Sequence, residues 1–176
     1  GWKAITDKIR IAASNIRSEG YYTESDRKLL YMGWVQGTLC SNATAYLPLI
    51  NNQQLESIQT ACNAAIRSVA RLPQKSADIS ITSVRNHLKL MSVEDIAEKQ
   101  ILMYAWKNRN NFQNVDTLGP TTRARSQGNI PHPVQKGIAG KMVSTLAACA
   151  FNKLPLELKL ESKASIVKAN IKKMFM

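Results

Sequence analysis

The side chains that could do chemistry in this sequence are mainly cations, and they concentrate in its later half. Up to Trp106 there are 12 Lys and Arg residues against 9 Asp and Glu, a formal charge of +3. From Lys107 onward there are 12 against 3, a formal charge of +9. A half this basic indicates a polyanionic partner, most often nucleic acid. A basic surface that only keeps the protein in solution stays open as the alternative.

Two groups of these cations have spacings that suit phosphate contacts. Arg123 and Arg125 lie in a stretch rich in Gly, Pro and Asn, where a flexible arginine can reach a phosphate at low steric cost. Lys168 and Lys172 are one helical turn apart in the last segment, so their like charges repel unless an anion lies opposite. Both groups therefore predict contacts to a phosphate backbone.

The remaining candidates have strong structural alternatives. Arg67 and Arg71 stand near the expected C-terminal end of a helix, where cations are favoured even without a ligand. Tyr21 and Tyr22 fall in an expected turn and could stack on bases, whereas Trp34 lies near an apolar stripe and is expected in the core. The complete set of predicted nucleic-acid-binding residues is Arg123, Arg125, Lys136, Lys141, Lys163, Lys168, Lys172, Lys173, Arg67, Arg71, Tyr21 and Tyr22.

Other kinds of chemistry have little support in the sequence. His87 and His132 lack Cys, Asp or Glu at ligand spacing, and there is no glycine-rich phosphate loop or nucleophile elbow. Glu94, Asp95 and Glu98 form the one tight acidic group, which could hold a metal but suits the start of a helix better. We expect no catalytic residue, no metal, no cofactor and no enzymatic activity from this chain alone.

The three cysteines, Cys40, Cys62 and Cys149, are far apart and lie among small or apolar residues. They predict buried free thiols in a reducing compartment, so we expect an intracellular protein, nuclear or cytoplasmic. No apolar run approaches the ~20 residues that span a bilayer, so no membrane partner is expected. The sequence opens abruptly at Gly1, which suggests a piece of something longer.

Helical periodicity dominates the pattern and predicts an all-α protein. A helical bundle is expected over residues 1–106, with N-terminal capping signals at Thr23, at Asn51 or Asn52, and at Ser92. Ser162 is expected to cap the last helix. Residues 107–140 predict a long flexible basic loop, because Gly, Pro and Asn interrupt every pattern there. Residues 141–176 predict a C-terminal helical pair that packs on the bundle.

The order of these segments resembles the region after the palm in reverse transcriptases of non-LTR retrotransposons of the jockey-like kind. Four stretches carry the resemblance: WKAITDKIRIAASNIR, RKLLYMGWVQGTL, LESIQTACNAAIRSVARLP and FNKLPLELKLESKASIVKANIKKMF. They are similar, in this order, to the helix after the palm, two thumb helices and the terminal element. The resemblance covers most of the chain except residues 107–140.

The resemblance implies a thumb-like bundle that holds template–primer duplex (RNA, DNA or a hybrid) while chemistry happens elsewhere in the polymerase. The paired metal-binding aspartates of the palm are absent from this chain, and two-metal phosphoryl transfer needs them. Phe151 stands where the family usually has Trp, and Val167 where it has Phe. The implied partners are nucleic acid and the remainder of the reverse transcriptase.

The terminal element would turn at Asn152 and clasp the last helix through Leu154, Leu156, Leu158, Ile166 and Ile171.

A function of another class remains open. A domesticated retroelement fragment could act as a helical protein–protein interaction module. Gly33 and Gly37 lie on one side of an expected helix, so a partner helix could approach closely there. The leucines around Pro155 offer a second possible surface for such a partner.

Overall fold

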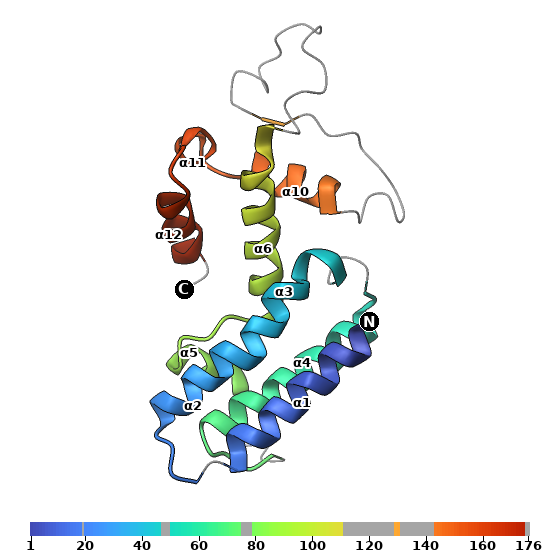
Figure 1. Cartoon of the computed structure of the whole chain (residues 1–176), viewed down its shortest axis with the longest axis vertical. Helices are drawn as coiled ribbons and strands as arrows, with labels where there is room; N and C mark the ends of the chain where they lie inside the picture. Colours follow the sequence, from blue (N-terminus) through green and yellow to red (C-terminus); the bar gives the residue numbers. More distant parts are fainter. Residues whose placement is uncertain (19, 47–49, 75–78, 111–128, 131–142, 175–176) are drawn as a thin grey trace, which may run out of the picture. The chain divides into compact units, whose positions relative to one another are not determined.

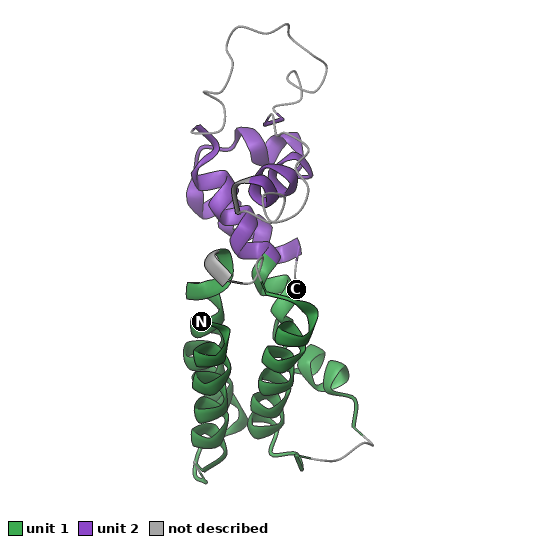
Figure 2. Ribbon diagram, turned by 90° about the vertical axis from the view of Figure 1, so that its right-hand side faces the viewer, with its two compact units in different colours: residues 1–97, 176 green, residues 98–175 purple. Residues whose placement is uncertain are grey.

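The computed structural model describes residues 1–18, 20–46, 50–74, 79–110, 129–130 and 143–174 (Figure 1). This part of the chain is all-α, with no strand in it. It divides into two compact units, Gly1–Ala97 (unit 1) and Glu98–Phe175 (unit 2) (Figure 2). The all-α fold class is therefore confirmed, and the division between the units falls within one helix.

Unit 1 is a bundle built around two long amphipathic helices. α1 (Trp2–Ser18) packs along α4 (Asn52–Val69), which lies beside it in Figure 1. α2 (Glu24–Leu30), η1 (Tyr31–Gln36) and α3 (Gly37–Tyr46) follow one another without a break. α5 (Ile81–His87) packs on α4, and α6 (Val93–Lys107) begins in unit 1. Burial of apolar area across these faces is the main stabilising term.

The apolar stripes predicted from the sequence form this core. Ile5, Ile9 and Ile16 of α1 are buried against Ile58 and Ile66 of α4 in one cluster. These positions recur every three or four residues, which places them on one face of each helix. The spacing in the sequence therefore fixes which face of each helix points inward.

At three of the described helix starts, reciprocal side-chain contacts satisfy backbone N–H groups left over in the first turn. Thr23 with Asp26, and Asn51 with Gln54, form reciprocal capping boxes. At α6 the Ser92 hydroxyl accepts from the Asp95 N–H at 3.0 Å, and the Asp95 carboxylate accepts from the Ser92 N–H at 3.1 Å. The predicted caps at Thr23, Asn51 and Ser92 are confirmed. The predicted cap at Ser162 is wrong, because α12 begins at Ala164 and Ser162 lies one position too early.

The six residues of η1 form a π-helix, which the sequence analysis did not foresee. The buried positions Tyr31, Val35, Leu39 and Ala43 repeat every four residues. On a regular helix a strict spacing of four drifts by about 40° at each step, since each residue turns 100°. The wider π turn compensates for this drift and keeps the four side chains in the core.

Unit 2 has a separate apolar core. It contains the later part of α6, then α10 (Val143–Asn152), α11 (Leu156–Leu160) and α12 (Ala164–Met174). Its buried residues include Trp106, Ile130, Phe151, Val167 and Ile171. The C-terminal region therefore has one more short helix, α11, than the predicted pair, and Phe151 is fully buried in its core.

Candidate nucleic-acid interface

The lysines of the last helix are the predicted site residues that the structure gathers on one element. Lys168, Lys172 and Lys173 are exposed on α12, and exposed Lys163 directly precedes it. On the inner side Val167 and Ile171 are fully buried. Burial of that face fixes the rotation of α12, so the lysines face away from the core of unit 2.

No carboxylate neutralises these lysines within α12, because the helix contains no acidic residue. Across the described ranges the one ion pair is Arg10 with Asp7, at 3.5 Å in unit 1. Glu161, the nearest acid before α12, accepts a hydrogen bond from the Lys163 backbone N–H at 2.8 Å. Lys168 and Lys172 therefore repel each other one turn apart with no counter-ion on their own helix.

Four hydrogen bonds of the Asn152 and Lys159 side chains join the segment before α12 to the rest of unit 2. The Asn152 amide accepts from the Ile130 N–H at 2.7 Å and donates to the Ile130 C=O at 2.9 Å. Lys159 donates to the Asn129 side-chain oxygen at 2.6 Å and to the Asn152 C=O at 2.9 Å. Desolvation by burial lowers the pKa of Lys159. This lysine is therefore a structural group, unlike the exposed lysines of α12.

The predicted clasp of the terminal element is right in part. Leu154 and Ile171 are buried and Leu158 is half-buried against the core. Leu156 and Ile166, which were also predicted to face inward, are 48% and 40% exposed. The cause is the extra helix α11 and the rotation of α12, which bring Val167 into the core in place of Ile166.

Arg67 and Arg71 have backbone partners in unit 1. Arg67 donates to the Pro73 C=O at 3.1 Å, and Arg71 donates to the Gly20 C=O. Arg71 itself has φ of 53°, in the left-handed region that ends a helix. The structure thus gives both arginines a role in fixing the end of α4, as expected for cations at a helix C-terminus.

The other predicted residues are divided between exposed positions and residues that the structure does not describe. Tyr21 is fully exposed in the turn before α2, and Tyr22 is 43% exposed. Arg123, Arg125, Lys136 and Lys141 lie outside the described residues. The described members of the set are therefore spread over both units, and only the α12 lysines share one element.

A groove beside η1 contains Gly33 and Gly37, the face that the sequence analysis offered to a partner helix. Trp34, expected in the core, is 44% exposed. It lines a cavity of about 410 Å³ between α1 and the continuous helix formed by η1 and α3. Gly33 and Gly37 form part of its floor, and Ile11 of α1 is 61% exposed in its wall. The prediction for Trp34 was wrong because the π turn shifts the faces of this helix.

Gly33 offers a test of what this groove contributes to the chain. A Cβ added at Gly33 would meet no atom within 4 Å. Because glycine in a helix interior destabilises the helix relative to alanine, we expect Gly33→Ala to raise the free energy of unfolding by about 0.5–1 kcal/mol. Denaturant unfolding measures the change, and a loss of stability would show that the open face is needed within this chain.

Comparisons with known proteins identify no relative: no family model, curated protein or solved structure matches this chain. Within the ranges that the structure describes, no helix is long and apolar enough to cross a membrane. In the same part of the chain, no three His, Cys, Asp or Glu side chains gather closely enough to hold a metal ion.

Proposed function

We propose that this chain is a non-catalytic, largely sequence-independent nucleic-acid-binding part of a retroelement reverse transcriptase. It would grip template–primer duplex through phosphate contacts, and the catalytic aspartates would belong to another part of the polymerase. The observation that carries the proposal is the exposed, acid-free lysine face of α12. The four motifs that resemble the region after the palm support the retroelement origin.

The paired lysines of α12 carry an electrostatic cost. Like charges one turn apart destabilise a helix by roughly 0.2–0.5 kcal/mol. Lys168 and Lys172 carry this cost without a carboxylate on α12 to offset it. A phosphate backbone lying along the helix would convert the repulsion into attraction and release counterions from the nucleic acid.

Charge reversal of this pair tests the proposal. We expect Lys168→Glu/Lys172→Glu to weaken binding to duplex at least tenfold at low salt. The slope of log affinity against log salt should fall by about 2, because two phosphate contacts are lost. Fluorescence anisotropy with labelled RNA, DNA and hybrid duplexes across a salt series measures both quantities.

Lys3→Glu/Lys89→Glu is the matched control, since it makes the same change of charge at two exposed lysines of unit 1. If the two double variants weaken binding equally, only net charge matters and α12 is not the interface. If the unaltered protein binds no duplex at any salt concentration, the proposed function itself is wrong.

The groove beside η1 favours a second candidate function, a helical protein–protein interaction module. Gly33 leaves open space, and Trp34 and Ile11 expose apolar surface next to it. A partner helix in this groove would bury that surface with little dependence on salt. The same salt series separates the candidates, because binding to nucleic acid weakens steeply as salt is added.

A further inference from the structure

A second cavity lies between α1 and α4, on a part of unit 1 that the sequence analysis did not single out. Its volume is about 260 Å³. Arg10, Ser14 and Arg17 of α1 line it at spacings of four and three residues, which places them on one face of that helix. The opposite wall is made by Ala64 and Ser68 of α4, and Ala13 and Gln74 complete the lining.

The lining is cationic and polar, with no carboxylate among its residues. Ser68 is buried, with 1% of its surface exposed, and its hydroxyl donates to the Ala64 C=O at 3.1 Å. The small side chains at positions 64 and 68 leave the space between the two helices open. The two guanidinium groups therefore border a cavity large enough for a small anion and several waters, since one water occupies about 30 Å³ of liquid.

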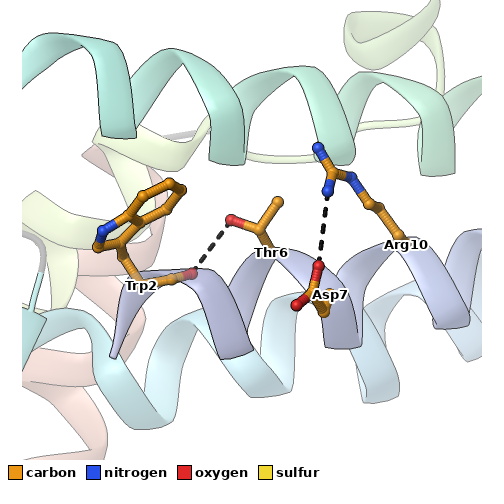
Figure 3. A network of polar contacts seen from close by, with 4 residues as sticks. All are labelled: Trp2, Thr6, Asp7 and Arg10. Atoms are coloured by element: carbon orange, nitrogen blue, oxygen red, sulfur yellow. Dashed lines mark hydrogen bonds and ion pairs between the residues drawn. The ribbon is translucent and has the colours of Figure 1, made fainter.

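Both guanidinium groups keep donors for a ligand. Arg10 reaches up from α1 toward α4, with Asp7 one turn before it (Figure 3). Their ion pair is long, at 3.5 Å, and both side chains are more than half exposed, so it binds Arg10 weakly. Arg17 donates one N–H to the Leu72 C=O at 3.2 Å. Each guanidinium has five N–H donors, so four remain beyond these contacts.

We propose that this cavity binds a phosphate group, held by forked hydrogen bonds from Arg10 and Arg17 and by the Ser14 hydroxyl. Planar guanidinium groups match phosphate oxygens two at a time, which an ammonium group cannot do. The phosphate belongs either to a free phosphate anion or to the backbone of a nucleic acid. The site is on unit 1 and does not depend on the function proposed for α12.

The test is a phosphate titration of the full chain followed by NMR of the arginine side-chain Nε–H groups. Sodium phosphate replaces sodium chloride at constant ionic strength. The Arg10 and Arg17 signals should shift together along one saturating curve, while the signal of Arg85 on α5 stays in place. If neither Arg10 nor Arg17 shifts, or if all arginine signals shift alike without saturation, the site is wrong.

Variants separate this site from general charge. Arg10→Gln/Arg17→Gln should lower phosphate affinity at least tenfold, whereas Lys3→Gln/Lys8→Gln removes two charges from the same helix and should leave it unchanged. Arg10→Lys/Arg17→Lys keeps the charge and should still weaken binding several-fold, which covers the case in which the first variant unfolds. Full phosphate affinity in the lysine variant would overturn the forked geometry.

A competition experiment then identifies the source of the phosphate. A thymidine decanucleotide that displaces inorganic phosphate from Arg10 and Arg17 would assign the site to a nucleic-acid backbone. A decanucleotide that leaves the phosphate signals saturated would assign it to free phosphate. Loss of nucleic-acid binding in the α12 variants affects neither result, so the two proposals fail independently.

Discussion

Asn152→Ala is expected to lower the free energy of unfolding of unit 2 by about 2–4 kcal/mol. The change removes both hydrogen bonds to Ile130, which is 1% exposed. The Ile130 N–H and C=O then lie in the core of unit 2 without these partners, and an unsatisfied buried polar group costs about 1–3 kcal/mol. The effect is large because one side chain satisfies two buried backbone groups.

Hydrogen exchange of the α10 and α12 amides measures this change, since a chain with two units need not unfold in one step. Asn110→Ala is the matched control, because Asn110 is an exposed residue of unit 2 that follows α6, and it should change stability by less than about 0.5 kcal/mol. If the α10 amides are equally protected from hydrogen exchange in the two variants, the hydrogen bonds between Asn152 and Ile130 do not stabilise unit 2.

Arg27→Met is expected to lower the free energy of unfolding of unit 1 by about 2–3 kcal/mol. Arg27 is 6% exposed, and it donates from Nε to the Val69 C=O at 2.7 Å and from a terminal nitrogen to the Tyr22 C=O. Methionine preserves much of the apolar stem but leaves both carbonyl oxygens without these donors.

Arg27→Met is expected to destabilise unit 1, and not to stabilise it, because the two carbonyl oxygens lose their donors. Replacing a whole buried ion pair by apolar groups is often neutral or stabilising, because both charges disappear together. Here only one partner is removed, and the Val69 carbonyl stays at the buried end of α4. Lys28→Met removes the same charge from the adjacent, half-buried position and is the control. In denaturant unfolding of unit 1, Arg27→Met should be clearly less stable than Lys28→Met, and equal stability would contradict the role of Arg27.

The features that the sequence predicted correctly are local ones. The caps at Thr23, Asn51 and Ser92 follow from residues three positions apart, and the stripes of α1 and α4 follow from helical spacing. Such patterns depend on a few neighbouring residues, so a sequence displays them directly. The all-α class follows from the same patterns.

The features that were missed depend on residues far apart in the chain. Asn152 was expected only to bend the chain, yet it binds Ile130, 22 residues earlier. Lys159 is buried although lysine usually lies in water, and no neighbouring residue indicates this. The cavity between α1 and α4 requires Arg10 and Arg17 to meet small residues of another helix, and only the packing of α1 on α4 shows it.

The arginines of unit 1 have a further consequence for acid denaturation. Arg17, Arg27, Arg67 and Arg71 all donate to backbone carbonyl oxygens, which do not take up protons as the solution is acidified. Acid unfolds many proteins by protonating carboxylates that are paired in the native state. Asp26, in contrast to these arginine contacts, is a carboxylate that acid can protonate. Hydrogen bonds from the Thr23 side chain and backbone lower its pKa. Its contribution is present near neutrality and disappears as pH falls through that lowered value, while the arginine–carbonyl contacts persist.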